Sequence, residues 1–172
     1  AEHSDDIRVF RNDGWTNQEL YPRFPADVNG DAKADMVGFG RDGVYVALST
    51  GSSFAAPTLW VKAYSPGQGW TSQDKYPRCV ADVNGDGKAD VIGFGQKGAF
   101  VSLSTGTAFT APTLWSSSYG ASSGWNSQDK LPRCVADVNG DGKADAVGFA
   151  KDGVYVSLSR GTSFGSPTRW IA

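Results

Sequence analysis

The chain has 172 residues, with 22 Gly, six Trp and 20% charged residues, a composition typical of a folded, turn-rich protein rather than a disordered one. Its formal net charge of −2 offers no basic field for nucleic acid or anionic lipid. We therefore expect no nucleic-acid partner. No apolar run approaches the roughly 20 residues of a membrane-spanning helix, so we expect no membrane span either.

The first predicted element is a single β-strand within DIRVFRND, Asp6–Asp13. Beyond it, the dipeptide GW stands at Gly14, Gly69 and Gly124, which gives a period of 55 residues. The second and third copies differ at 16 of 49 aligned positions, which leaves 33 identities. Self-similarity at such a period is typical of solenoids, propellers or arrays. We therefore expect an N-terminal strand segment, 1–13, and three blade repeats, 14–68, 69–123 and 124–172.

Each repeat is predicted to contain four short strands and no helix. The strands expected in the middle copy are Arg78–Val83, Asp90–Gly95, Ala99–Ser104 and Pro112–Tyr119. The third alternates apolar and small polar residues, and the fourth opens with Pro, as an outer edge strand can. Four antiparallel strands per roughly 50 residues predict an all-β fold of β-propeller blades, three in each chain. A β-prism or a solenoid of stacked hairpins is the alternative.

Three blades do not close a propeller ring, because propellers typically have about 4–8 blades. An open array would leave apolar blade faces exposed, which soluble proteins rarely do. Head-to-tail association of two chains would give a closed ring of six blades, so we expect a homodimer. Ile7–Phe10 would then complete the last blade of the partner or lie as an extra strand on its own. A trimer would exceed the usual number of blades.

An acidic nonapeptide opens the second strand of every repeat. DVNGDGKAD occurs at Asp82–Asp90 and at Asp137–Asp145, and the near copy DVNGDAKAD lies at Asp27–Asp35. Carboxylate and amide oxygens at positions 1, 3, 5 and 9 suit a hard cation, and a flexible loop favours calcium over magnesium. We expect structural calcium, not in every repeat, with the ligands Asp27, Asn29, Asp31, Asp35, Asp82, Asn84, Asp86, Asp90, Asp137, Asn139, Asp141 and Asp145.

This loop does not have the pattern of a calcium sensor. The flanks are strands, and Gly occupies position 12, where an EF-hand has a bidentate Glu. The alternative is a metal-free turn in which Asp and Asn bond to their own backbone. At position 6, which favours Gly, the first copy has Ala32. A left-handed Ala there would cost about 1 kcal/mol unless the turn changes, so we expect this copy to bind calcium most weakly.

The two cysteines, Cys79 and Cys134, stand one repeat apart in the same phrase, PRCVAD. Equivalent positions of neighbouring repeats usually lie further apart than the roughly 7 Å Cα–Cα limit for a disulfide, so two buried free thiols are expected. Free thiols favour a reducing interior and calcium loops favour an exterior, so the compartment is left open. The opening AEHSDD shows no initiator Met and no signal peptide, consistent with removal of a leader or a tag.

Two phrases of the repeat resemble known families. ADVNGDGKADVIGFG followed by GAFVSLS resembles the FG-GAP repeat of integrin-type propellers. The longer phrase GW(T/N)SQDK(Y/L)PRCVADVNGDGKAD(V/A)(I/V)GF is similar to fungal N-acetylglucosamine-binding propeller lectins of the Psathyrella velutina type. The resemblance covers about Gly14 to Trp170 and implies that N-acetylglucosamine binds in grooves between blades. Those lectins have six or seven blades in one chain, which supports assembly here.

A sugar site needs an aromatic face and a few planar polar groups, and the segment before each inner strand provides both. The predicted sugar-contacting residues are Trp15, Gln18, Tyr21, Arg23, Trp70, Gln73, Asp74, Tyr76, Arg78, Trp125, Gln128, Asp129 and Arg133. The third copy has Leu131 at the Tyr position, which weakens the expectation there. The alternative is that these Trp side chains wedge blades together and Arg pairs with Asp. Inter-blade packing is expected chiefly of Trp60, Trp115 and Trp170.

The pattern favours a non-catalytic, multivalent lectin for glycans or glycoproteins that end in N-acetylglucosamine. A calcium-stabilised protein-interaction propeller that binds no sugar is the second hypothesis. An enzyme is not expected, because the single histidine is His3 and no nucleophile–base arrangement recurs in the repeats. Paired carboxylates match the spacing of a cation loop rather than that of a glycosidase pair.

Overall fold

The computed structural model describes residues 17–172 and contains twelve strands in three antiparallel sheets of four. The first sheet is formed by β1 (Arg23–Ala26), β2 (Asp35–Phe39), β3 (Val44–Ala47) and β4 (Thr58–Val61). The second is formed by β5 (Arg78–Ala81), β6 (Asp90–Phe94), β7 (Ala99–Ser102) and β8 (Thr113–Ser116). The third is formed by β9 (Arg133–Ala136), β10 (Asp145–Ala150), β11 (Gly153–Ser157) and β12 (Thr168–Ile171).

Two short 3-10 turns, η1 (Pro66–Gln68) and η2 (Ala121–Ser123), lie in the linkers between sheets. Within residues 17–172, no helix is long and apolar enough to cross a membrane. The prediction of an all-β fold with four antiparallel strands per blade is confirmed. The strand expected within Asp6–Asp13 lies outside the described residues.

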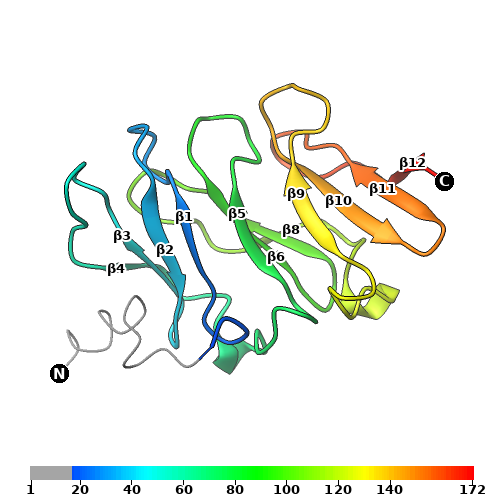
Figure 1. The fold of residues 1–172 in the computed structure, drawn as a ribbon, viewed down its shortest axis with the longest axis horizontal. Helices are drawn as coiled ribbons and strands as arrows, with labels where there is room; N and C mark the ends of the chain where they lie inside the picture. The colour runs from blue at the N-terminus through cyan, green and yellow to red at the C-terminus, as the bar shows by residue number, and fades with distance from the viewer. Residues whose placement is uncertain (1–16) are drawn as a thin grey trace.

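The three sheets stand side by side as successive blades (Figure 1). β5 contacts both β1 and β9, so the first strand of each blade faces the inside of the array. Each blade then proceeds outward in chain order to its fourth strand. The blades do not close a ring within the chain.

A glycine fixes the turn between the second and third strands of each blade. In the middle blade, a Cβ added to Gly98 would lie only 2.0 Å from the carbonyl oxygen of Ser116, just beyond the pairing of β7 with β8. Gly43 and Gly153 stand equally close to the fourth strands of their own blades. Only a residue without a side chain allows this hairpin to pack under the outer strand.

The hydrophobic core lies between blades rather than within a single one. One buried cluster joins Trp60 and Tyr64, from the first blade and its linker, to Phe109 of the second. A second cluster joins Trp115 in the same way to Phe164 of the third blade. The ring centroids are 5.1 Å apart in the first pair and 5.2 Å in the second.

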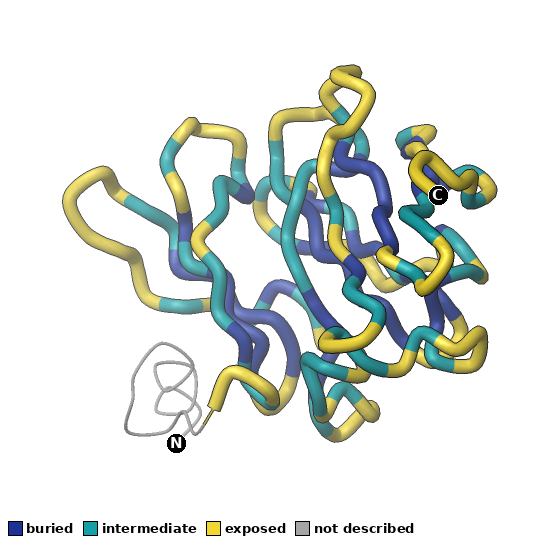
Figure 2. Tube along the Cα trace, turned by 45° about the vertical axis from the view of Figure 1, so that its right-hand side comes forward, coloured by how far each residue is buried: buried dark blue, intermediate teal, exposed yellow. Residues whose placement is uncertain are grey.

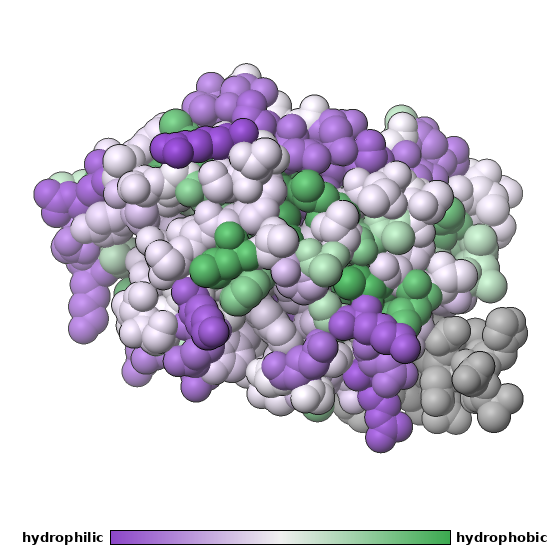
Figure 3. Space-filling view, turned by 180° about the vertical axis from the view of Figure 1, so that it is seen from behind, coloured by the Kyte–Doolittle hydropathy of each residue, from purple (hydrophilic) through white to green (hydrophobic). Residues whose placement is uncertain are grey.

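The expectation that Trp60 and Trp115 pack between blades is therefore confirmed. Burial of each such aromatic side chain contributes about 1.5–3 kcal/mol. Buried residues run along the middle of the sheets, and exposed ones gather in the loops (Figure 2). Seen from behind, hydrophobic residues form patches across the middle of the molecule, and hydrophilic residues border them above and below (Figure 3).

Candidate functional site

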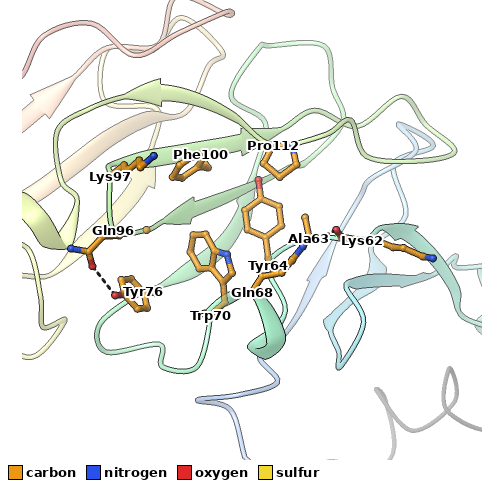
Figure 4. A pocket seen from close by; sticks show the side chains of 12 residues that line it. Lys62, Ala63, Tyr64, Gln68, Trp70, Tyr76, Gln96, Lys97, Phe100 and Pro112 are labelled. Carbon is orange, nitrogen blue, oxygen red and sulfur yellow. Dashed lines mark hydrogen bonds between the residues drawn. The ribbon is translucent and has the colours of Figure 1, made fainter.

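A cavity of about 510 Å³ lies between the β4–β5 linker and the second blade. Its walls come from the linker, from the turn after β6, and from the outer part of the blade (Figure 4). The side chains and glycines that line it are Lys62, Ala63, Tyr64, Gln68, Gly69, Trp70, Tyr76, Gly95, Gln96, Lys97, Phe100 and Pro112.

Trp70 is the centre of an aromatic wall in this cavity. Its ring centroid lies 5.2 Å from that of Tyr64 and 6.0 Å from that of Tyr76. A Cβ added to Gly93 on β6 would lie 2.6 Å from the indole ring, so glycine at this position allows the ring to rest on the strand. Trp70 is half-buried and still lines the cavity. It therefore packs against the second blade while part of its ring faces the cavity, and its contact with a sugar stays a prediction.

Tyr64 holds this wall in place from an unusual backbone conformation. Its φ is 60°, in the left-handed region that non-glycine residues rarely adopt. The ring is buried, and its hydroxyl is 2.9 Å from Ser102 Oγ of the next blade. Burial raises the pKa of the Tyr64 phenol, so the side chain is a neutral hydrogen-bonding group at physiological pH. Tyr119 repeats this arrangement, with a φ of 62° and a 2.8 Å contact to Ser157.

Planar polar groups lie at the rim of the cavity. The Tyr76 hydroxyl donates to Gln96 Oε1 at 2.8 Å, so one side chain of the aromatic wall also holds the amide of the rim. Gln68 Nε2 donates to the carbonyl of Lys62 at 3.3 Å. An aromatic wall with a few oriented amides and ammonium groups is suited to a ring that has one apolar face and several hydroxyls.

Arg78 lies on the other side of the linker, as a buried clamp between blades. The residue is 1% exposed, and its guanidinium donates to three carbonyls: Leu20 (3.2 Å), Glu19 (2.7 Å) and Tyr64 (3.1 Å). Its Nε donates to Gln73 Oε1 at 3.0 Å, and Gln73 Nε2 donates back to the carbonyl of Arg78. Burial lowers the pKa of Arg78 to about 10, which leaves it charged at neutral pH.

Arg133 and Gln128 make the same clamp at the next junction. Arg133 donates to the carbonyls of Asp74 (3.3 Å), Lys75 (3.1 Å) and Tyr119 (3.1 Å). The Asp74 carboxylate accepts from Ser127 Oγ and from the amide of Asp129, and these bonds lower its pKa. These hydrogen bonds hold Gln73, Asp74, Arg78, Gln128 and Arg133 in the blade junctions. The same residues also line a cavity at the inner strands, and the sugar-contacting role predicted for them stays a prediction.

The first copy is described only in part. The amide of Arg23 donates to Gln18 Oε1 at 3.1 Å, as in the other two copies, and Tyr21 and Arg23 are half-buried. Trp15, which completes the predicted set, lies outside the described residues.

The third blade has a smaller counterpart of the cavity. It measures about 270 Å³ and is lined by Ser118, Tyr119, Ser123, Trp125, Tyr155 and Pro167. The ring centroids of Tyr119 and Trp125 lie 5.4 Å apart, as in the middle copy. Leu131, which replaces Tyr76, does not line it. The loss of this aromatic residue accompanies a cavity of about half the volume.

The prediction that both free cysteines are buried is wrong. The cysteines are free, but Cys79 is only half-buried and Cys134 is exposed. They stand on the inner strands β5 and β9, which line a second cavity of about 470 Å³ at the centre of the open array. Within residues 17–172 no further sheet covers these strands, and Cys134 on the last inner strand is the more exposed of the two.

The acidic loops adopt a turn held by their own hydrogen bonds. In the middle copy, Asp82 accepts from the amides of Gly85, Asp86 and Gly87, and Asp90 accepts from those of Val83 and Ser104. The ammonium of Lys88 lies 3.1 Å from Asp86 Oδ2.

Among residues 17–172 no three His, Cys, Asp or Glu side chains converge closely enough to hold a metal. Calcium binding stays a prediction from the sequence. Ala32 has a φ of 65°, near the 83° of Gly87, so the first copy keeps the same turn despite its Cβ.

The acidic loops also join neighbouring blades. The carbonyl of Asp27 accepts from the amide of Ala89 in the next blade, and the carbonyl of Val28 accepts from the Ser104 hydroxyl. Asp82 and Val83 bind the third blade in the same way, through Ala144 and Ser159. The loop is therefore part of the blade junction.

Several residues of the cavity were not predicted from the sequence: Tyr64, Phe100, Gln96, Lys62 and Lys97. One signal was available for Tyr64, because a Tyr recurs at Tyr119, one period later and six residues before the next Trp. For Gln96 and Lys97 no such signal exists, since the third copy has Lys151 and Asp152 there.

Comparison with known proteins agrees with this fold. The model of the FG-GAP-like repeat matches residues 27–93 and 82–148, which together span most of the chain. A lectin of Agrocybe aegerita that specifically recognises non-reducing terminal N-acetylglucosamine is 37% identical, with a TM-score of 0.86. The match covers 92% of this chain and 39% of the lectin chain, so the sequence spans less than half of that protein.

Two more distant structures share the fold alone. The Photorhabdus luminescens Tc holotoxin pore is 21% identical, with a TM-score of 0.61, over 86% of this chain and 7% of that chain. TcdB2-TccC3 without its hypervariable C-terminal region is 18% identical, with a TM-score of 0.65, over 89% and 7%. No curated protein matches the sequence.

Proposed function

This chain belongs to the FG-GAP-like repeat family, and from this premise we propose that it is a non-catalytic, multivalent carbohydrate-binding protein. The ligand class is a sugar of the N-acetylglucosamine type, at the ends of glycans or glycoproteins. The observation that carries the proposal is the cavity walled by Trp70 and Tyr76 in a chain with a lectin as a 37% identical solved relative.

The chemistry of the cavity supports this ligand class. The ring of Trp70 offers an apolar surface for the C–H face of a pyranose, and such stacking is a common use of aromatic side chains. Gln96, held by Tyr76, presents an amide to hydroxyl or acetamido groups. Each site would be shallow and weak, and repetition of the cavity in successive blades would provide avidity for a glycosylated surface.

We propose in addition that two copies of the chain complete a ring of six blades. The open array exposes large apolar side chains on its terminal blades, among them Phe54 and Trp170. A closed cyclic assembly removes such surfaces from water.

The test is a calorimetric titration of the protein with N-acetylglucosamine. Tyr76→Leu and Gln96→Lys place third-blade residues in the middle cavity, so the fold should tolerate both. We expect each variant to weaken binding at the middle site by about tenfold, the loss of one good contact. The matched control is Leu114→Ala, an exposed apolar change on β8 outside the cavity. Failure of the unmodified protein to bind any glycan at millimolar sugar would contradict the proposal and favour the protein-interaction propeller.

A further inference from the structure

The two blade junctions inside the chain are made by one repeated set of contacts. At each junction, a Trp of one blade packs on a Phe of the next, and the Trp carbonyl accepts from the Phe amide. A serine hydroxyl reaches the carbonyl of a buried valine, as Ser104 does to Val28. An acidic side chain accepts hydrogen bonds from the next linker, as Asp74 does from the Ser127 hydroxyl and the Asp129 amide.

The third blade carries the Trp, the Val and the acidic residue of this set, but residues 17–172 contain no further blade that supplies the Phe and the Ser. Trp170 is 49% exposed, against 7% for Trp60 and 6% for Trp115. Val138 is 38% exposed, whereas Val28 and Val83 are completely buried. Among residues 17–172 nothing donates to the carboxylate of Asp129, although its equivalents Glu19 and Asp74 accept two or more bonds each. We call this surface, Asp129, Val138 and Trp170, the acceptor face.

The first blade carries the Phe, the Ser and the linker segment of this set. Phe54 is 53% exposed, against 5% for Phe109 and 6% for Phe164. The Ser49 hydroxyl has no acceptor within the described residues, although its equivalents Ser104 and Ser159 donate to valine carbonyls. Asn17–Glu19 stand one period before Ser72–Asp74, the segment that Glu19 caps. We call this surface, Asn17–Glu19, Ser49 and Phe54, the donor face.

We propose that a second copy of this chain occupies each face, through a head-to-tail seam that repeats the internal junction. Trp170 of one copy packs on Phe54 of the other, and the Trp170 carbonyl accepts from the Phe54 amide. The Ser49 hydroxyl donates to the carbonyl of Val138, and Asp129 caps the backbone of Asn17–Glu19. This inference rests on the ring proposed above and assigns the residues that make it.

The occupant follows from complementarity. Each face lacks the groups that the opposite face of the same chain carries, so an identical copy supplies them. Contacts of this head-to-tail kind close into a ring when the rotation between copies allows it, and otherwise extend into filaments. Two copies bring together six blades, within the range of about 4–8 that propellers adopt. A ring of two copies has two identical seams and leaves neither face exposed.

The experiment is the molecular mass of the 172-residue chain in solution, by light scattering and by sedimentation across a concentration series. We expect twice the chain mass of 18.2 kDa. Trp170→Asp and Phe54→Asp should each give monomers, and Asp129→Ala should raise the dimer dissociation constant at least about tenfold. Both aromatic side chains are exposed in the single chain, so circular dichroism should show unchanged folding. Leu114→Ala, an exposed apolar change on the middle blade, should remain dimeric.

A monomeric unmodified chain, a trimer or a filament would overturn the seam of two copies. A dimer that persists in both Asp variants would also overturn it, because association would then use another surface. Sugar binding is measured separately, on the Trp170→Asp monomer, whose middle cavity is intact. A Trp170→Asp monomer that still binds sugar would support the seam and leave the proposed function unaffected. A dimeric unmodified chain that binds no sugar would contradict the proposed function and leave the seam unaffected.

Discussion

The indole ring of Trp70 lies on Gly93, so closely that a Cβ on this glycine would come within 2.6 Å of it. Trp125 and Gly148 are related in the same way in the third blade. The relationship places an aromatic face from the linker against the second strand of the blade, and so builds one wall of the candidate site.

Gly93→Ala should therefore destabilise the protein by about 1–3 kcal/mol, the usual cost of overpacking against a ring that cannot move aside. Denaturant unfolding measures this change in the free energy of unfolding. The matched control is Gly67→Ala, where a Cβ would meet nothing within 4 Å. Equal stability of the two variants would show that the Trp70 ring does not rest on β6.

Ala32→Gly should stabilise the first blade. Ala32 holds a φ of 65° that costs an L-residue about 1 kcal/mol, and glycine adopts it without steric strain. A gain of up to about 0.5 kcal/mol is expected in chemical unfolding, because the greater conformational freedom that glycine loses on folding offsets part of the relief. The reverse change in the middle copy, Gly87→Ala, should cost a similar amount. A loss of stability on Ala32→Gly would disprove left-handed strain at this position.

Alkaline pH should destabilise the fold through the inner strands. Burial raises the pKa of the Cys79 thiol from 9.0 to about 12, and it also raises the pKa values of Tyr64 and Tyr119. Between pH 9 and 12, the unfolded chain loses the Cys79 proton while the folded chain keeps it. This contribution to stability is therefore complete below pH 9 and is lost as pH approaches 12.

The measurement is the free energy of unfolding at several pH values, for the unmodified chain and for Cys79→Ala. The variant should show a shallower decline above pH 9. Identical slopes would mean that the thiol titrates alike in both states.

Removal of divalent cations should leave the protein folded. The carboxylates of Asp82 and Asp90 are satisfied by backbone amides, and Lys88 neutralises Asp86, so the turn persists without a metal. Circular dichroism in EDTA is the measurement, and an unfolded protein would contradict this expectation. A calcium-dependent rise in melting temperature that magnesium does not reproduce would support the calcium predicted from the sequence.

The fold was predictable because its signals are local and repeated. Strand alternation, turn glycines and the period of 55 identify the blades, and the φ preference at position 6 identified Ala32 as the unusual residue. The recurrence of Trp60 and Trp115 after the motif PTL indicated packing between blades, which the structure confirms.

The candidate site was predictable only in part. The sequence shows that Trp70, Gln73, Tyr76 and Arg78 share one linker, but not which side of the linker each faces. Trp70 and Tyr76 face the cavity, whereas Arg78 turns to carbonyls of the preceding blade, including Glu19, 59 residues away. Such long-range carbonyl partners leave no pattern in the sequence, so the clamp and the cavity cannot be separated before the fold is known.

The most direct test of a carbohydrate site at Trp70 is the NMR spectrum of its indole N–H during titration with N-acetylglucosamine. The resonance would be assigned by its absence in Trp70→Phe. We predict that this resonance shifts saturably with the sugar and that the resonance of Trp60, which is buried between blades, does not shift. Tyr76→Leu should weaken the response. An unchanged Trp70 resonance at saturating sugar would contradict a carbohydrate site in this cavity.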